Sequence, residues 1–296
     1  MSDRSLEYLK DISNRSLLLS EFSLKHRSAY RILFLLQLIA TLRIFADIFE
    51  YRRSVFLIKR DMIRGENIVS QQKINLGPKI SVIVPTKNEE EKLPLLLKSI
   101  ESQTYSNIEV IVTDCMSNDT TEGIARKFGA KVVKIPVDSV GLASSTGAKQ
   151  SSGSIIIRCD ADTIFLPEFM ENIVRRFQSN NGINFVLSSQ YYYDGNFIIN
   201  FLTFLYIKYW RPPWMTPGHM TAIRRKIYFE VGGYDPQMRR DEDTDLGQRI
   251  VKRYGSYHIF VDRKLVVLIS ARAVKKVGTF SYLIQTGLGI SISFFQ

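Results

Sequence analysis

The sequence predicts an α/β fold in which a mostly parallel central sheet carries helices on both faces. Short apolar segments rich in β-branched residues alternate with helical patterns between residues 79 and 182, which is typical of βαβ units. Polar and acidic residues follow directly after these apolar segments. Ligands of such sheets bind beyond the carboxyl ends of the strands, so these residues are expected to line a cleft.

The first half of the predicted sheet contains two strands and two helices. The segment "KISVIVP" predicts a strand over residues 79–85, and Asn88 is expected to cap the helix within "NEEEKLPLLLKSIESQ". A second strand, "IEVIVTD", ends at Asp114. The next helix is predicted from 120 to 128, because Gly129 follows as a typical helix terminator.

Two more strands complete the regular part of the pattern. "KVVKI" predicts the third strand, "GLASSTGAKQSS" a helix and "SIIIRCD" the fourth strand. Pro167 then suits the first turn of a helix over "PEFMENIVRRFQ". Beyond residue 182 the pattern is looser: "GINFVLSSQYYY" predicts a strand and "RPPWMTPGHM" an irregular segment, and a helix is expected from near Asp243 to Gly255.

Segments of different composition flank this region. The three predicted parts are a basic helical extension over 1–78, a main domain over 79–272 and a helical C-terminal segment over 273–296. In the extension, an amphipathic run begins at Ile32, but Arg43 and Asp47 interrupt it and make a membrane-spanning helix unsuitable. The C-terminal segment carries no charge from Val277 onward. For both flanking segments, binding to a membrane surface and packing on the main domain stay open.

Composition narrows the class of function. A chain of 296 residues with 45% hydrophobic and 23% charged residues suits a globular protein with a sizeable core. The net charge of +11 suits a phosphate-bearing substrate or an anionic membrane surface. Zinc-finger spacing and basic helices with interleaved aromatic residues are absent from the sequence, so no nucleic-acid partner is expected. Cys115 and Cys159 make no disulfide framework, and no signal peptide is recognised. The predicted location is therefore the cytoplasm, either free or peripheral at the cytoplasmic face of a membrane.

The stretch "IIIRCDAD" places two carboxylates, those of Asp160 and Asp162, one residue apart at the end of an apolar strand. Like charges at such short range raise the pKa of one group unless a cation lies beside them. A hard cation such as Mg²⁺ or Mn²⁺ takes oxygen ligands and normally retains water and diphosphate oxygens. Taken alone, the pair is more simply explained as a solvated loop or a helix N-cap.

Three further segments make the acidic pair more informative. The runs "SVIVPTKNEEEKLPLLLKSIESQ", "IEVIVTDCMSNDTTEGIARKFGAKVV", "GAKQSSGSIIIRCDAD" and "GGYDPQMRRDEDTDLGQR" occur in this order, and together they resemble the inverting glycosyltransferases of family 2. The resemblance covers residues 79–272. It implies a GT-A fold, a UDP- or GDP-linked sugar donor, and Mg²⁺ or Mn²⁺ as cofactor.

The resemblance also implies donor-binding roles for residues at the strand ends. Pro85, Thr86 and Glu89 correspond to the loop that wraps the nucleoside of the donor. Asp114 corresponds to an acid that accepts a hydrogen bond from the donor's base. Many relatives carry a second acid directly after it, where this chain has Cys115, so the choice between UDP and GDP stays open.

The same resemblance implies metal-binding and catalytic roles. Asp160 and Asp162 correspond to the D-x-D motif, with Asp160 towards the ribose and Asp162 on the metal beside the diphosphate. Asp243, in "EDTDL", corresponds to the base that takes the proton from the acceptor hydroxyl, and Glu242 contacts the acceptor or orients that base. His219 is a candidate third metal ligand, although a hydrogen-bonded loop histidine is the more common case.

Some positions depart from the pattern of the family. An Arg–Asn pair often precedes the D-x-D motif in relatives, and Lys149 is the nearest cation here, which makes it a candidate donor contact. Arg272, in "SAR", is a second candidate contact to the diphosphate. The Q-x-x-R-W motif of processive synthases is absent from the sequence, so one transfer per encounter is expected.

Together these features predict a metal-dependent, inverting glycosyltransferase that acts on a glycan or lipid-linked acceptor through a hydroxyl or phosphate. Two alternatives stay open. A sugar-1-phosphate nucleotidyltransferase would need a basic, Gly-rich loop after the first strand, where this chain has the acidic "PTKNEEE". A non-catalytic GT-A-like protein that binds polyanions or membrane would not need the set Asp160, Asp162 and Asp243.

Overall fold

The computed structural model describes residues 42–43, 46–53, 55–56, 77–209, 211–212, 219–238, 241–278 and 281. The chain divides into two compact units, Met1–Ser54 and Val55–Gln296. In the first unit, the described residues 42–43 and 46–53 are helical. Most of the predicted extension and of the C-terminal segment lies outside the described residues, so the domain boundaries drawn from the sequence remain predictions.

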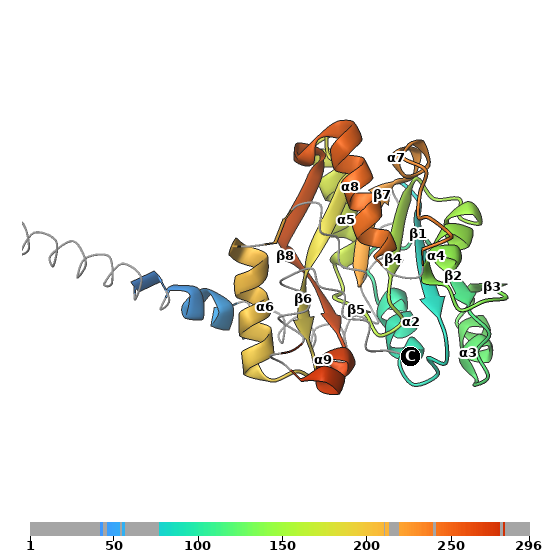
Figure 1. The fold of residues 1–296 in the computed structure, drawn as a ribbon, viewed down its shortest axis with the longest axis horizontal. Coiled ribbons are helices and arrows are strands. Elements are labelled where there is room, and N and C mark those ends of the chain that lie inside the picture. Colours follow the sequence, from blue (N-terminus) through green and yellow to red (C-terminus); the bar gives the residue numbers. More distant parts are fainter. Residues whose placement is uncertain are drawn as a thin grey trace, which may run out of the picture. The chain divides into compact units, whose positions relative to one another are not determined.

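One sheet forms the framework of the described part of the second unit (Figure 1). Its strands are β1 Ile80–Thr86, β2 Ile108–Asp114, β3 Lys131–Lys134, β4 Ile155–Cys159, β5 Ile164–Phe165, β6 Phe185–Tyr192, β7 Met220–Arg224 and β8 Ile259–Ile269. Their order across the sheet is β3-β2-β1-β4-β7-β6-β8-β5. Figure 1 shows the strands side by side, from β8 and β6 at one side to β2 and β3 at the other.

Parallel pairs make up most of the sheet. β1 pairs in parallel with β2 and β4, β2 pairs with β3, and β6 pairs with β8. β7 lies antiparallel to β4 and β6, and β5 lies antiparallel to β8. The predicted mostly parallel sheet is therefore confirmed, and β7 and β5 are strands that the sequence pattern did not indicate.

Helices connect the strands and cover both faces of the sheet (Figure 1). They are α2 Leu93–Glu101, α3 Thr121–Lys127, α4 Val140–Lys149, α5 Phe169–Ser179, α6 Phe197–Tyr209, α7 Arg225–Glu230, α8 Glu242–Tyr254, the 3-10 turn η2 Ser256–His258 and α9 Arg272–Val277. Within the described residues, no helix is long and apolar enough to cross a membrane.

Two separate apolar clusters show how the faces are filled. On one face, Ile80, Val82 and Val84 of β1 pack with residues of α2 and α5. On the other face, Ile83 packs with residues of α4, α7 and α8, among them Leu246. Alternate residues of a strand point to opposite faces, so a central strand covered on both sides must be apolar throughout. This explains why "SVIVP" and "IIIRC" are nearly continuous apolar runs.

The start of α2 differs from the sequence prediction. The helix begins at Leu93, with Lys92 at the cap position, and Asn88 lies in the loop with a positive φ of 53°. Proline fits only the first turn of a helix, so Pro94 fixes the helix start next to itself. Asn88 is therefore no helix cap. Its Oδ1 accepts a hydrogen bond of 2.9 Å from the backbone N–H of Asn118 and joins the loops after β1 and β2.

Candidate active site

The carboxyl ends of β1, β2 and β4 meet at one edge of the sheet. In the parallel register, Thr86 ends β1 directly opposite Asp114, which ends β2. The loop that begins with Asp160 follows β4, which is the other neighbour of β1. The edge therefore brings together the strand-end residues that the sequence singled out.

Asp114 is held from both sides of its carboxylate. Thr86 Oγ1 lies 3.4 Å from Asp114 Oδ1, and the Ser117 backbone N–H donates to Asp114 Oδ2 over 3.3 Å. The Ser117 hydroxyl also donates to Asp114 Oδ1. The side chain is buried at 3% exposure. These contacts fix the orientation of the carboxylate, and Pro85 lies beside them as the residue before Thr86 in β1.

Arg158 joins the loop after β4 to the start of α8. Its Nη1 lies 2.9 Å from Asp160 Oδ1, and its Nη2 donates to Glu242 Oε1 over 3.4 Å. The Arg158 and Glu242 side chains are nearly inaccessible, whereas the Asp160 side chain is 41% exposed. Burial alone would lower the pKa of Arg158, but the charges of Asp160 and Glu242 raise it above its ordinary value. The arginine is therefore a permanent cation between two acids from distant parts of the chain.

Asp162 shares a second arginine with the loop after β1. Arg272, the first residue of α9, lies with Nε 3.1 Å from Asp162 Oδ2. Its two terminal nitrogens donate to the two oxygens of Glu89 over 2.9 and 2.6 Å, a bidentate pair. Burial and the charge of Asp160 raise the pKa of Asp162 to about 6, although Arg272 opposes this shift. The structure thus brings Glu89, Asp162 and Arg272 together.

Asp243 lies in the first turn of α8 and is buried at 8% exposure. Burial raises the pKa of its carboxyl to about 7; the charge of Arg158 opposes the rise and that of Glu242 adds to it. The Thr244 backbone N–H donates to Asp243 Oδ1 over 2.8 Å. A carboxyl group with a pKa near neutrality can accept a proton efficiently at physiological pH, as a general base must.

His219 directly precedes β7, whose first residue, Met220, pairs with Cys159 at the end of β4. This register places His219 next to the start of the Asp160 loop. The ring is buried, and its Nε2 has no hydrogen-bond partner among the described residues. Burial and the charges of Arg211 and Arg158 hold the pKa of His219 well below its ordinary value, so the imidazole is neutral. A neutral imidazole with a free nitrogen is the form that binds metals.

The residues around the D-x-D motif fit a divalent cation with an incomplete protein shell. In the described part of the chain, no group of three or more His, Cys, Asp or Glu side chains could hold a metal ion by itself. The two carboxylates of Asp160 and Asp162 suit Mg²⁺ or Mn²⁺ when water and diphosphate oxygens supply the remaining ligands. The unpartnered Nε2 of His219 and the raised pKa of Asp162 are the features that agree with such a cation.

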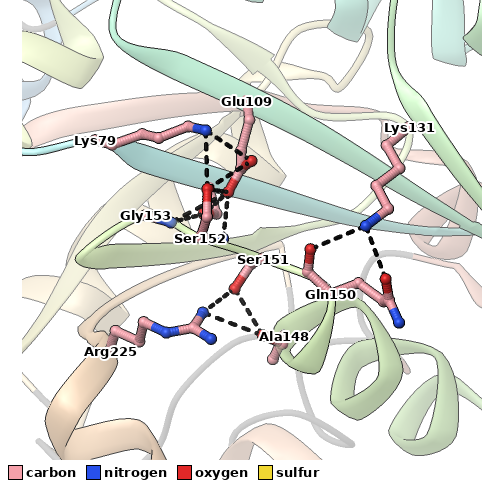
Figure 2. Close-up of polar contacts among 10 residues, drawn as sticks. Lys79, Glu109, Lys131, Ala148, Gln150, Ser151, Ser152, Gly153 and Arg225 are labelled. Carbon is pink, nitrogen blue, oxygen red and sulfur yellow. Dashed lines mark hydrogen bonds and ion pairs between the residues drawn. The ribbon is translucent and has the colours of Figure 1, made fainter.

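Lys149 is the candidate that the structure does not bring to this edge. It ends α4, and a helix between parallel strands runs back from the carboxyl edge of the sheet to the amino edge. The next residue, Gln150, accepts hydrogen bonds from Lys131 at the start of β3, as Figure 2 shows. Lys149 therefore lies at the amino edge of the sheet, opposite the candidate site. This placement contradicts its predicted contact with the sugar donor.

The sequence prediction omitted Arg158 and Ser117. A charged residue inside "IIIRC", two positions before the acidic pair, was the available signal for Arg158. Ser117 carries no distinguishing pattern. Backbone geometry gives a further signal, because the non-glycine residues with positive φ within the described ranges are Asn88, Met116 and Asp241. They lie after β1, after β2 and before α8, so all three border the candidate site.

Comparison with known sequences identifies related proteins. A profile described as "Glycosyl transferase family 2" matches residues 81–244. A protein of Haemophilus influenzae, named as an uncharacterized glycosyltransferase, is 28% identical over 182 residues. The match covers 56% of this chain and 60% of that protein, so the chain spans less than two thirds of this relative.

Two solved structures share the fold. The mannosyltransferase PcManGT from Pyrobaculum calidifontis, in complex with GDP-Man and Mn²⁺, has a TM-score of 0.57 at 20% identity; the match covers 81% of this chain and 70% of that one. Glucosyl-3-phosphoglycerate synthase from Mycobacterium tuberculosis, in complex with Mn²⁺, UDP-Glc and phosphoglyceric acid, has a TM-score of 0.51 at 25% identity. That match covers 72% of this chain and 79% of that one.

Proposed function

Because the chain belongs to glycosyltransferase family 2 and has the GT-A fold, we propose that it transfers one sugar per encounter from a UDP- or GDP-linked donor, with inversion at the anomeric carbon. The acceptor is a hydroxyl or phosphate of a glycan or of a lipid-linked molecule. The reaction requires Mg²⁺ or Mn²⁺. The M. tuberculosis synthase, which binds UDP-Glc with Mn²⁺, supports a nucleotide-sugar donor and a divalent cation.

One observation carries this proposal. The guanidinium of Arg158 contacts both Asp160 and Glu242, so the D-x-D loop and the start of α8 are separated by a single side chain. An inverting transfer needs this proximity, because the donor's diphosphate and the acceptor's base act on one anomeric carbon. Acidic residues with no functional role would be expected to be solvated separately and not to share one buried arginine.

The donor side is supported by the contacts at the ends of β1 and β2. Thr86 and Asp114 form one hydrogen-bonded unit, and Glu89 lies in the same loop region as part of the ion pair with Arg272. A carboxylate such as Asp114 can accept N–H bonds from a nucleobase, and the guanidinium of Arg272 suits diphosphate oxygens. Each of these assignments is part of the proposal.

Asp243 is the general base that acts on the acceptor. Its buried carboxylate takes the proton from the acceptor hydroxyl as the new glycosidic bond forms and the bond to the diphosphate breaks. Asp160 and Asp162 would hold a divalent cation, and His219 is a further candidate ligand. The chemistry that this cation supplies when bound is neutralisation of the charge that grows on the leaving diphosphate.

Thermal unfolding of the full chain with UDP, GDP and their sugar conjugates, each with and without Mn²⁺, tests the donor assignment. A ligand that binds only the folded state stabilises it by about 2.7 kcal/mol at a concentration of 100 Kd. We expect Mn²⁺-dependent stabilisation by one nucleotide class, lost in Asp162→Asn and kept in Asp245→Asn, a variant of an acid on α8 that pairs with Arg249.

Adding a nucleoside triphosphate and a sugar 1-phosphate to the ligands of this experiment separates the rival functions. Stabilisation by a nucleoside triphosphate together with a sugar 1-phosphate, and not by nucleotide sugars, would identify a nucleotidyltransferase instead. A chain that responds to none of these ligands, with or without Mn²⁺, is not a nucleotide-sugar enzyme, and the proposed function would then be wrong.

A further inference from the structure

Arg158 is an unusual residue for its position. It is 4% exposed and lies in β4, where its neighbours in the strand are isoleucines and a cysteine. Moving a guanidinium out of water is costly, and replacing a buried ion pair by apolar side chains often leaves stability unchanged or improved. Stability of the sheet therefore does not explain an arginine at this place. The explanation has to come from its contacts with Asp160 and Glu242.

The two partners of Arg158 are unequal. Glu242 is buried with it, with a side-chain exposure of 6%, whereas the side chain of Asp160 is 41% exposed. If the guanidinium were removed, Asp160 would be hydrated, but Glu242 would remain as a buried charge without its partner. Breaking a buried pair in this way is strongly unfavourable. The effect of Arg158 therefore falls mainly on the α8 side.

The start of α8 lacks the usual capping side chain in the described part of the chain. Within the described residues, Asp241 at the cap position makes no side-chain cap hydrogen bond, and its backbone has a positive φ of 59°. Serine, threonine, asparagine and aspartate normally fix a helix start through such a bond. The Arg158–Glu242 contact instead ties the first residue of the helix to β4, one residue before Asp243.

We propose that Arg158 is a positioning residue, which fixes the first turn of α8 through Glu242 so that Asp243 faces the acceptor at a set distance from the D-x-D loop. This inference rests on the proposed function of Asp243 as the base. A planar guanidinium can reach two carboxylates in fixed directions, whereas a lysine ammonium is a flexible point charge. The geometry, and not only the charge, is what Arg158 supplies.

The test compares Arg158→Lys, which keeps the charge, with Arg158→Met, which removes it. In Arg158→Lys we expect kcat to fall on the order of 10- to 100-fold, the size of loss that a misplaced catalytic group causes. Donor affinity is expected to change by less than about threefold, because Asp160 stays solvated. Arg224→Lys is the matched control. Arg224 is the last residue of β7 and pairs with Ile155 at the amino end of β4, away from the Asp160 loop. Its guanidinium donates to the backbone carbonyls of Ile183 and Phe177.

The pH profile of kcat provides a readout that a merely structural role would not move. The charged or titratable groups that act on Asp243 are Arg158 from β4, Glu242 from α8, Asp160, Tyr234 and Arg211. Loss of the cation in Arg158→Met should shift the acid limb to higher pH, whereas Arg158→Lys should leave the limb in place and lower its plateau. Destabilisation alone would lower the yield of folded enzyme and leave the limb unchanged.

A double-mutant cycle with Glu242→Gln shows whether Arg158 acts through Glu242. If it does, Arg158→Lys should cause little further loss of kcat once Glu242 is replaced. Independent, multiplying losses would overturn the inference, and so would wild-type kcat in folded Arg158→Lys. Failure of the proposed function is distinguishable, because the wild-type chain would then show no stabilisation by nucleotide sugars; if only the role of Asp243 were wrong, Asp243→Asn would keep its turnover. If Arg158→Met does not fold, the kcat of Arg158→Lys and the double-mutant cycle still test the positioning role of Arg158.

Discussion

At Asp243, a single carboxyl group combines burial, a nearby cation and a position in the first turn of a helix. Burial raises its pKa to about 7, and Arg158 limits the rise. A base with a much higher pKa would be protonated at neutral pH, and one near the ordinary value of aspartate would accept a proton weakly. The neighbours of Asp243 therefore decide whether it can work as a base.

Asp243→Asn is predicted to remove most of the turnover and to leave donor binding nearly unchanged. Asparagine keeps the shape of the side chain but cannot accept the proton, and general-base assistance is worth about 10²–10⁴ in rate. Initial rates and calorimetric donor binding measure the two effects separately. Asp245→Asn, two residues along the same helix, is the control and should retain activity. Wild-type rates in Asp243→Asn would exclude it as the base.

At the scale of elements, the amino edge of the sheet contrasts with the carboxyl edge, where the candidate site lies. Figure 2 shows Glu109 of β2 at the centre of a cluster, where it accepts hydrogen bonds from Ser152 and Gly153 before β4 and pairs with Lys79 before β1. Ser81 of β1 donates to the same carboxylate over 2.5 Å. One carboxylate thus ties three neighbouring strands at the edge where no substrate is expected.

Glu109→Gln is predicted to destabilise the fold in a pH-dependent way. Burial alone would raise the pKa of Glu109, but hydrogen bonds from Ser81, Ser152 and Lys79 lower it to about 2. A carboxylate with a depressed folded-state pKa contributes stability above its unfolded value of about 4.5, and that contribution is lost as the pH falls towards 2.

Urea unfolding at pH 7 and pH 3 measures this effect. We expect a loss of about 1–3 kcal/mol at pH 7, typical of hydrogen bonds to a charged group, and a smaller loss at pH 3. Glu122→Gln is the control, because Glu122 forms ion pairs with Arg126 and Lys134 at the surface, where solvent screens them. Equal effects of the two variants would contradict the role of Glu109.

Two helical glycines allow a matched test of helix packing. A Cβ atom at Gly147 of α4 would lie 2.5 Å from Ile83 Cγ2 and 3.1 Å from Thr113 Cγ2, so the helix packs closely on β1 and β2. At Gly123 of α3, nothing lies within 4 Å. Thermal melts should show Gly147→Ala destabilised by about 1–3 kcal/mol and Gly123→Ala unchanged or stabilised by up to about 1 kcal/mol. A tolerated alanine at Gly147 would show that α4 can move away from the sheet.

The elements of the first half could be predicted from the sequence because each signal is local. "IEVIVTD" becomes β2 residue for residue, and Gly129, with a φ of 74°, follows α3 as expected. Strand β7 could not be predicted, since "MTAIR" is short and its pairing with β4 and β6 depends on the rest of the sheet. Asn88 was misplaced because its side chain serves a contact between loops, which no local pattern encodes.

Part of the candidate site could also be predicted from the sequence. Asp114 ends a strand, and Asp160 and Asp162 follow one, so the topology of a parallel sheet was enough to group them. The partner of Asp162 was not predictable, because Arg272 arrives from a helix 110 positions later in the numbering. The prediction for Lys149 was wrong for the opposite reason. This residue is near the D-x-D motif in sequence, but it ends α4, which runs back to the amino edge of the sheet.

For the whole molecule, the net charge of +11 is the property that acts at long range. It should draw the chain to anionic lipid surfaces as well as to phosphate-bearing substrates. If the lipid-linked acceptor is correct, the full chain is predicted to sediment with vesicles that contain anionic lipid at low salt and to be released at high salt.

Vesicles of neutral lipid are the control for this binding experiment. Recovery of the chain in the supernatant with anionic vesicles at low salt would contradict membrane association. Salt-resistant binding to both kinds of vesicle would instead indicate insertion of apolar side chains. Either result leaves the donor assignment untouched, because nucleotide binding is measured separately.

The positive φ angles of Asn88, Met116 and Asp241 have a consequence for how such an enzyme can evolve. All three lie at the carboxyl edge of the sheet, and none of them belongs to the two apolar clusters or to the Glu109 network. Replacements in these loops can relieve local strain and redirect side chains without disturbing the packed layers. Mutation of these three residues is therefore a route by which such a scaffold can alter its substrate contacts while its packed layers stay the same.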